Sequence, residues 1–265
     1  MFSNNLDPER VLIFDIKGPM AHFRKYYTNS SSLSYLFPPR TVVVGLIAGL
    51  LGLPSERHTK DREKIYYEKF DEKKSNVAVS LKSKVRRIMQ TVNYIRTKSL
   101  SEVDGSAGGT QIPLEILLPE GDNEITYRIY FYHTDEEEEI YNDLKGRLEE
   151  RRFVFPPYMG ITEFLASIEY IDEGKVSKNP KREVELNSVC KLKEVELDFS
   201  GEELQYVTEK MPTGFLNNRT PKKSEKYVLE VNGKPMKLKL KDNATCYSVN
   251  YLENGCKVIE NIMFM

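Results

Sequence analysis

The stretch that decides the fold runs from residue 11 to residue 53 and reads VLIFDIKGPMAHFRKYYTNSSSLSYLFPPRTVVVGLIAGLLGL. Its first part, Val11 to Lys17, is apolar and β-branched and ends at Gly18-Pro19, which predicts a buried strand. Its last part, Val42 to Leu51, is apolar on all sides and predicts a short buried helix, with Thr41 as a plausible N-cap. A polar and aromatic loop therefore joins a strand to a helix.

Further strands and one more helix follow along the chain. The predicted strands are Val77 to Leu81, Ile88 to Ile95, Ile112 to Leu118, Ile125 to Tyr132 and Leu165 to Tyr170. An amphipathic helix is predicted where Ile140, Leu144 and Leu148 recur every four residues. The order strand, helix, strand, strand, helix, strand favours a ferredoxin-like arrangement, the antiparallel platform on which RRM domains bind RNA.

The sequence predicts an α+β protein with two domains. A ferredoxin-like (RRM-type) domain is expected over residues 1–175, with a basic β-hairpin insertion at about 82–111. The charged segment that follows ends this domain, and a smaller β-rich C-terminal domain is expected over 184–265. Within it, Asn232-Gly233 between two short apolar runs predicts a hairpin turn.

Charge is balanced overall but unevenly distributed. The formal net charge is -1, yet no acidic residue occurs between Asp15 and Glu56 or between Lys73 and Ser101. A third basic stretch holds Lys210, Arg219, Lys222 and Lys223. Segregated basic charge suits phosphate binding. An ordinary solvated face explains any one of these runs equally well.

Several function classes lack support in the sequence. There is no P-loop, HExxH, GxSxG or kinase signature. Cys190, Cys246 and Cys256 form no CxxC pair, so neither a disulfide framework nor a zinc site is expected. No metal and no cofactor is expected. Without a secretory signal, and with apolar runs well short of the ~20 residues of a membrane span, the protein is expected to be cytoplasmic and to have no membrane partner.

The loop from Gly18 to Arg40 has the chemistry of a single-strand RNA contact. Its Arg and Lys side chains suit phosphates, its aromatic rings suit base stacking, and its Ser and Asn side chains suit sugar and base edges. A surface loop with aromatics that anchor it to the core deserves equal weight.

Catalysis would have to depend on a histidine. His22 or His133, beside a Lys or Tyr, could shuttle protons in a metal-independent ribonuclease. Lone histidines are more often structural, so this interpretation stays the alternative.

The segment from residue 16 to residue 53 resembles the N-terminal signature of the Cas-five family of CRISPR-associated proteins, most closely its subtype I-B branch. The signature is a strand followed by G-x-x-A-x-F-R, S-x-S-Y, P-P-x-T and G-L-x-x-x-x-L-G. The residues that carry it are Gly18, Ala21, Phe23, Arg24, Ser32, Ser34, Tyr35, Pro38, Pro39, Thr41, Gly45, Leu46, Leu51 and Gly52.

The resemblance implies a non-catalytic RAMP-superfamily subunit of a type I CRISPR Cascade interference complex. Such subunits cap the 5′ handle of the guide RNA (crRNA), contact the Cas-seven backbone subunit through a thumb, help to dock the large Cas-eight subunit, and meet target DNA only through the complex. The residues expected to bind RNA are Lys17, His22, Arg24, Lys25, Tyr26, Tyr27, Ser34, Tyr35, Arg40, Lys84, Arg86, Arg87, Arg96, Lys98 and Arg219.

The same family also implies the alternative function. In its subtype I-C branch, precursor crRNA is cut by a Tyr, a Lys and a His. This chain lacks a Lys-His pair, because Ala21 precedes His22 and Tyr132 precedes His133. The sequence therefore favours RNA binding without cleavage, with a purely structural protein as the third and weakest interpretation.

Overall fold

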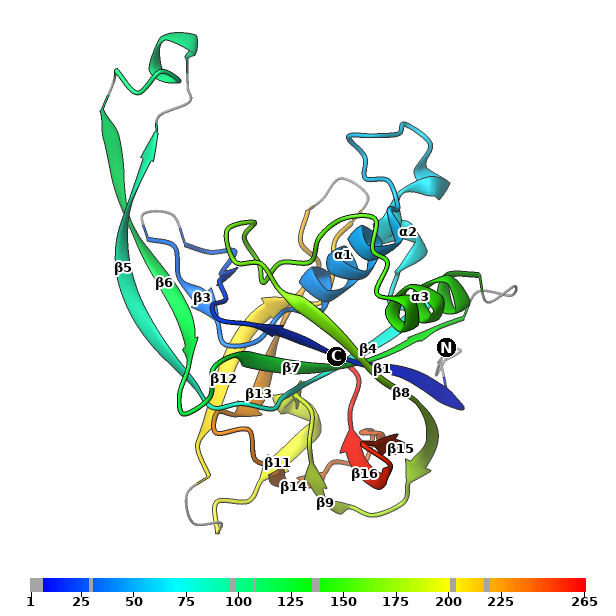
Figure 1. Ribbon diagram of the computed structural model, residues 1–265. Coiled ribbons are helices and arrows are strands. Elements are labelled where there is room, and N and C mark those ends of the chain that lie inside the picture. The colour runs from blue at the N-terminus through cyan, green and yellow to red at the C-terminus, as the bar shows by residue number, and fades with distance from the viewer. Residues whose placement is uncertain are drawn as a thin grey trace.

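A computed structural model of the chain describes residues 7–28, 31–95, 99–106, 108–134, 139–200, 204–216 and 220–265. The fold is mostly β-sheet with few helices (Figure 1). The largest sheet has six strands in the order β16-β15-β8-β1-β7-β4, and each neighbouring pair is antiparallel. Its strands are β1 (Arg10–Gly18), β4 (Ser75–Leu81), β7 (Ile125–His133), β8 (Ser167–Asn179), β15 (Cys246–Glu253) and β16 (Cys256–Ile262).

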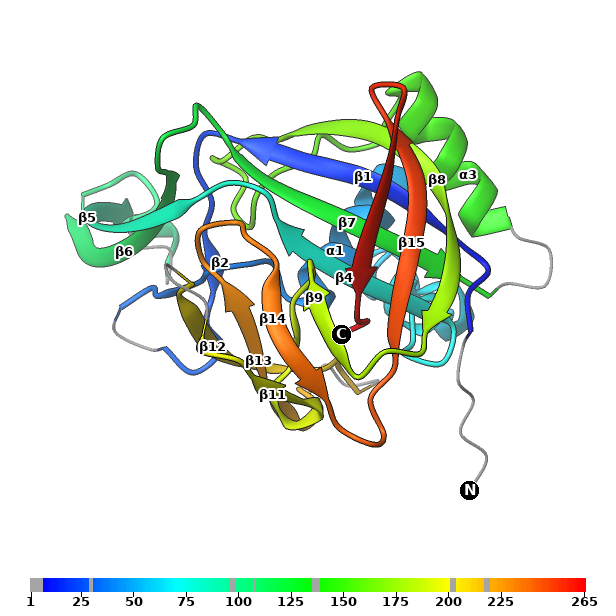
Figure 2. The same cartoon turned by 90° about the horizontal axis from the view of Figure 1, so that it is seen from below.

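The helices cover one face of this sheet (Figures 1 and 2). Two small sheets lie beside it, and one of them, through Met211, Tyr227 and Leu229, packs into the same core as the helices. The helices are α1 (Arg40–Leu51), α2 (Tyr66–Lys69) and α3 (Glu139–Glu150), with short 3-10 turns at Arg62–Lys64, Leu100–Glu102 and Leu192–Glu194. β7 alternates as predicted, with Tyr127, Ile129 and Phe131 in the helix-side core and Tyr130 in the core of the opposite face. No helix in the described ranges is long and apolar enough to cross a membrane.

Helix α1 begins without the predicted cap. Pro39 occupies the N-cap position, no side chain caps the helix, and Thr41 lies inside it. The Pro39 carbonyl accepts the amides of Val42 and Val43, at 2.8 and 3.1 Å, and so begins the hydrogen bonding of the helix. Gly52 ends the helix in the left-handed conformation, with φ at 74°.

A long hairpin, here called the arm, projects from the body of the protein (Figure 1). It consists of β5 (Val85–Ile95) and β6 (Gly109–Pro119), which pair from end to end. The sequence predicts a hairpin insertion at about 82–111, whereas the two strands of the arm run from Val85 to Pro119. Within the two strands, basic side chains occur only at the base, at Arg86 and Arg87.

The chain between β8 and β15 forms two three-stranded sheets. One has the order β10-β13-β12, from β10 (Cys190–Lys191), β13 (Ser224–Glu230) and β12 (Tyr206–Pro212). The other has the order β11-β14-β9, from β11 (Val195–Leu197), β14 (Met236–Leu240) and β9 (Glu183–Leu186). The two-domain division stays a prediction, and β15 and β16 extend the sheet of the predicted first domain.

The hairpin predicted at Asn232-Gly233 is wrong, because β13 and β14 belong to different sheets. The carboxylate of Glu230 accepts the amides of Asn232 and Lys234, each at 2.8 Å. It therefore satisfies amide groups that a hairpin ladder would have used, and Pro235 offers no amide. Gly233 makes the turn possible with φ at 75°.

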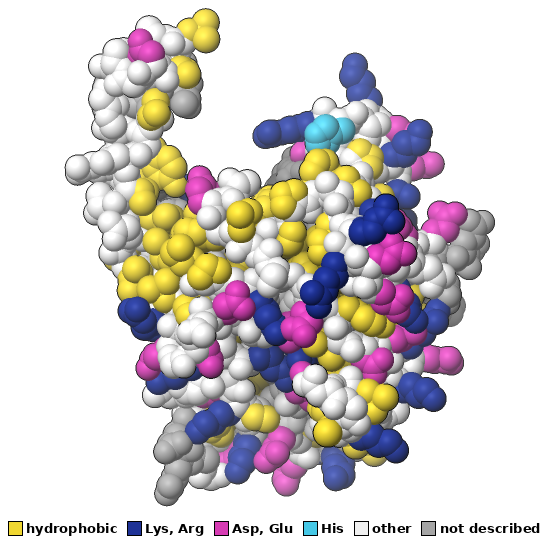
Figure 3. Space-filling view, viewed as in Figure 1, with side chains coloured by type: hydrophobic (Ala, Val, Ile, Leu, Met, Phe, Trp, Pro, Cys, Tyr) yellow, Lys and Arg dark blue, Asp and Glu magenta, His cyan; other side chains and the backbone are white. Residues whose placement is uncertain are grey.

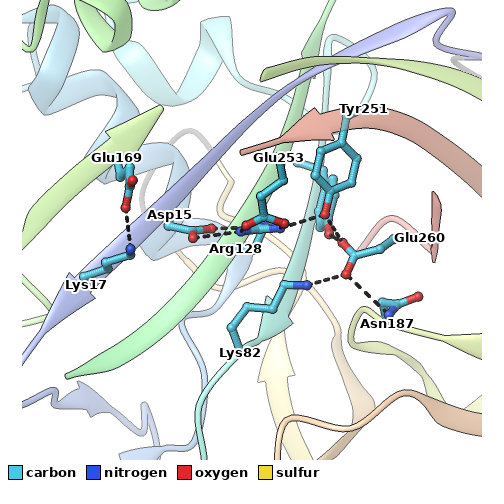
Figure 4. A network of polar contacts seen from close by, with 10 residues as sticks. Asp15, Lys17, Lys82, Arg128, Glu169, Asn187, Tyr251, Glu253 and Glu260 are labelled. Atoms are coloured by element: carbon cyan, nitrogen blue, oxygen red, sulfur yellow. Dashed lines mark hydrogen bonds and ion pairs between the residues drawn. The ribbon is translucent and has the colours of Figure 1, made fainter. Parts of the chain in front are cut away.

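The face of the large sheet away from the helices holds a buried network of charges (Figure 4). Arg128 donates to both carboxylate oxygens of Asp15, at 2.8 and 2.9 Å, and also to Glu253. Glu260 accepts hydrogen bonds from Tyr251 and Lys82. These contacts join β15 and β16 to β1 and β7, so the C-terminal strands are fixed to the central sheet by paired charges.

Candidate nucleic-acid interface

The loop between β1 and α1 is held against the base of the arm. Two short strands, β2 (Phe23–Arg24) and β3 (Ser34–Tyr35), pair with each other within it. Single bridges then join Ala21 to Leu117 and Ser32 to Leu114 of β6. Backbone pairing therefore anchors the described part of the loop to the base of the arm.

Several residues predicted to bind RNA instead hold this loop in place. Ser34 is fully buried, and its hydroxyl accepts the Phe23 amide at 2.9 Å and donates to the Tyr35 carbonyl at 2.7 Å. Its amide donates to Glu115 of β6 at 2.7 Å. Tyr35 is buried as well, and its hydroxyl donates to the carbonyl of Lys210 at 3.1 Å. Burial raises the pKa of Tyr35.

His22 is buried beside the same residues. Its Nδ1 lies 2.7 Å from the Glu115 carbonyl and its Nε2 lies 2.9 Å from the Ser32 hydroxyl. Since a carbonyl only accepts, Nδ1 carries the proton and Nε2 accepts from Ser32. Burial lowers the pKa of His22, which favours this neutral form. Gly160, with φ at 92°, packs on the His22 carbonyl so closely that a Cβ would lie 1.9 Å from the oxygen.

His133 also lies inside the fold. It is 4% exposed, and its Nε2 lies 3.0 Å from the carbonyl of Lys69. Its ring packs edge-on against Phe70, with 5.6 Å between the ring centroids. The two histidines considered for catalysis thus belong to different buried environments, one beside the arm and one beside α2.

Lys25 and Arg87 are engaged by one carboxylate. Glu209 of β12 is 3% exposed and accepts Lys25 at 2.6 Å and Arg87 at 2.9 Å. Arg87 also lies 3.9 Å from Glu115. Two of the predicted phosphate ligands are therefore neutralised by acids from distant parts of the sequence.

The other predicted basic residues, apart from Arg24, divide into four groups. Arg40 is buried and donates to the carbonyls of Phe70 and Ser75, each at 2.9 Å. Lys17 pairs with Glu169, and Lys84 pairs with Glu120 at 2.7 Å. Arg86 is exposed with no ion pair among the described residues. The remaining positions, Arg96, Lys98 and Arg219, lie outside the described residues.

Tyr26, Tyr27 and Arg24 remain on the surface of the loop. Tyr26 is 48% exposed and Tyr27 is 52% exposed, and their rings meet edge to face with centroids 5.3 Å apart. Ser224 of β13 donates to the Tyr26 hydroxyl at 3.0 Å. Arg24 is exposed and donates to the Thr28 carbonyl at 3.3 Å. Two aromatic rings beside a guanidinium can stack on unpaired bases and contact a phosphate.

Two residues that organise the loop, Glu115 and Glu209, were not predicted from the sequence. Glu115 is the single charged residue of β6, between Leu114 and Ile116. A lone charge in an apolar strand signals a partner inside the fold, because an unpaired buried charge is costly. That signal does not identify the partner.

Comparison with known proteins gives one family. The model of the family described as CRISPR-associated protein (Cas_Cas5) matches residues 11–225. A solved structure described as a CRISPR protein from Archaeoglobus fulgidus is 14% identical, with 95% of this chain and 99% of that chain covered and a TM-score of 0.53. A chain of a "CRISPR RNA-guided surveillance complex" is 12% identical, with 86% and 91% covered and a TM-score of 0.46. No curated protein matches.

Proposed function

Because the chain belongs to the Cas-five family of CRISPR-associated proteins, we propose that it is a non-catalytic RNA-binding subunit of a type I Cascade interference complex. Its task in this proposal is to cap the 5′ handle of the crRNA. The observation that carries the proposal is the exposed Tyr26–Tyr27 pair beside Arg24, at the base of the arm. Such a surface suits single-strand RNA, whose bases can leave the stack and pack on aromatic rings.

The architecture supports this assignment. The strand order β8-β1-β7-β4, with α1 following β1 and α3 following β7, supports the proposal of a ferredoxin-like domain. We therefore infer a RAMP-type core with the arm as its thumb. The signature between Gly18 and Gly52 supports placement in the subtype I-B branch.

The arm supports a role in assembly. A two-stranded ribbon is at best marginally stable alone in water. This one leaves Met89, Tyr94 and Ile95 at least 44% exposed. Its visible face is mostly hydrophobic or uncharged (Figure 3). We infer that the Cas-seven subunit covers the arm and that the Cas-eight subunit docks elsewhere on the body, in a cytoplasmic ribonucleoprotein.

Binding without cleavage is the proposal because of how both histidines are engaged. His22 has both ring nitrogens within hydrogen-bond distance of the fold's own groups, and His133 is packed against Phe70. A general acid or base must come within about 2.6–3.2 Å of the proton that it transfers. Neither ring offers a free nitrogen to a ribose hydroxyl in this arrangement.

The test is a binding titration and a cleavage gel with the full chain and labelled precursor repeat RNA in EDTA. We expect salt-sensitive binding and no cut. Tyr26→Ala and Tyr27→Ala should each weaken binding by about 5-fold to 150-fold, from ~1–3 kcal/mol per stacked base. Phe199→Ala is the control for removing an exposed aromatic ring, because Phe199 is 75% exposed and packs on Tyr206 and not on the tyrosine pair.

Two results would overturn the proposal. Metal-independent cutting at one position of the repeat, lost in a folded His22→Ala or His133→Ala variant, would make the protein the processing ribonuclease. Binding that is absent, or unchanged in both tyrosine variants, would remove the loop from the RNA interface.

A further inference from the structure

Two lysines face each other on the small sheet next to the candidate interface. Lys210 of β12 and Lys226 of β13 are direct cross-strand partners, and both are exposed. Neither ammonium group has an ion pair among the residues that the structure describes. Like charges directly opposite each other destabilise an antiparallel pair. The free protein therefore keeps a repulsive contact that a bound anion would relieve.

The neighbouring acids do not compensate this pair. Glu209 precedes Lys210, and Glu225 precedes Lys226, so both acids lie on the other face of their strands. Each already has a lysine there, because Glu209 pairs with Lys25 and Glu225 pairs with Lys193 at 2.9 Å. The face that carries Lys210 and Lys226 is left positive.

The other small sheet shows the opposite arrangement. On β14, Lys237 lies opposite Glu185 of β9, and Lys239 lies between Glu183 of β9 and Glu196 of β11. Each exposed lysine of β14 thus has an acid directly across the ladder. The contrast between the two sheets makes the Lys210–Lys226 pair a specific feature of β12 and β13.

The lysine pair is continuous with the aromatic surface. Ser224, whose hydroxyl donates to Tyr26, lies two residues before Lys226 on β13 and so on the same face of the strand. Two residues of a strand span about 7 Å. On β12, the carbonyl of Lys210 accepts the Tyr35 hydroxyl, which fixes the strand against the β1–α1 loop.

We propose that Lys210 and Lys226 bind the phosphates of the RNA strand whose bases stack on Tyr26 and Tyr27. This inference rests on the proposed function and extends its site across β12 and β13. Lysine ammonium groups serve as point charges for phosphates, and a phosphate near both would turn their repulsion into attraction. A path along two rigid strands also gives the RNA a fixed direction away from the loop.

The experiment measures the salt dependence of binding for the same labelled repeat RNA, between 50 and 200 mM salt. Each phosphate contact with single-stranded RNA adds about 0.7 to the slope of log affinity against log salt. Lys210→Gln/Lys226→Gln should therefore lower the slope by about 1.4, so that wild type loses ~7-fold more affinity over this range. Lys237→Gln/Lys239→Gln removes the same charge from β14 and should leave the slope unchanged.

The outcomes separate this inference from the proposed function. If the RNA does not bind to the wild type at all, the proposed function fails and takes the inference with it. If binding depends on Tyr26 but the Lys210/Lys226 variant keeps the wild-type slope, the function stands and the inference is refuted. Equal losses of slope in both lysine variants would also refute it, because they would reflect net charge alone.

Discussion

Removing Glu209 should destabilise the protein strongly, because it would leave Lys25 charged and unpaired inside the fold. Glu209 is 3% exposed, and the Lys25 side chain is 11% exposed, with 2.6 Å between them. Breaking a buried ion pair by removing one partner costs about 3–5 kcal/mol. Arg87 adds little to this figure, because its side chain is 36% exposed and is solvated when released.

The double variant Lys25→Met/Glu209→Leu should recover most of that loss. Replacing a buried pair by apolar groups of similar volume is often neutral or stabilising. In urea denaturation we expect Glu209→Leu alone to lose ~3–5 kcal/mol, or about 6–20 °C in melting temperature. The double variant should lie within about 1 kcal/mol of wild type, a coupling of ~2 kcal/mol or more.

The same double variant tests whether Lys25 contacts RNA. Since the Lys25 ammonium is already bound to Glu209, the double variant should bind repeat RNA with wild-type affinity. If Glu209→Leu lowers the free energy of unfolding by less than about 1 kcal/mol, the burial argument is refuted. A tenfold or greater loss of RNA affinity in the stable double variant would refute the conclusion that this lysine serves the fold.

Three further predictions follow from the same contacts. Burial lowers the pKa of His22 below the ordinary 6.5, so the folded state binds fewer protons, and the free energy of unfolding should fall as the pH drops below 6.5. The slope is at most ~1.4 kcal/mol per pH unit, and His22→Gln should remove it in urea titrations between about pH 5 and 6.5. Gly160→Ala should cost about 3 kcal/mol or more, measured by thermal unfolding, because φ is 92° and the new Cβ would overlap the His22 carbonyl; an unchanged melting temperature would contradict this geometry. Lys210→Gln should stabilise the RNA-free protein by about 0.2–1 kcal/mol in urea, since it removes a like-charge cross-strand contact, and a destabilised variant would show that the lysine has a partner.

Local pattern predicted β1, β4, β7 and the start of β8, but it did not predict that β15 and β16 join the same sheet. The apolar run that begins at Val11 forms β1, the all-apolar run after Thr41 forms most of α1, and the alternating residues around Ile129 form β7. These elements depend on neighbours within a few residues along the chain. The cap at Thr41 and the hairpin at Asn232-Gly233 failed because Pro39 and Glu230 supply the decisive contacts.

The placement of the basic residues could not be read from the sequence. An acid-free run predicts positive charge only if no acid from elsewhere meets it. Lys25 meets Glu209 from 184 positions away, and Arg40 is enclosed by carbonyls of residues 30 and 35 positions further on. Such pairings depend on tertiary packing, which local charge counts do not contain.

Several residues of the family signature hold the loop in place. Ala21, Phe23, Ser34 and Tyr35 are each at most 3% exposed, and a Cβ at Gly18 would lie 2.8 Å from the Met159 sulfur. These residues bind the loop to the core and to the arm, so in this chain they serve the fold of the loop.

The side chains that we assign to RNA mostly lie outside the signature. Tyr26, Tyr27, Lys210 and Lys226 are exposed and have few contacts with the core, so folding constrains them little. Substitutions at these exposed positions should therefore change RNA affinity with little effect on stability. RNA contact is thus distinguished from a role in the fold by measuring RNA affinity in variants whose stability is unchanged. Exposed positions permit such variants, and buried positions do not.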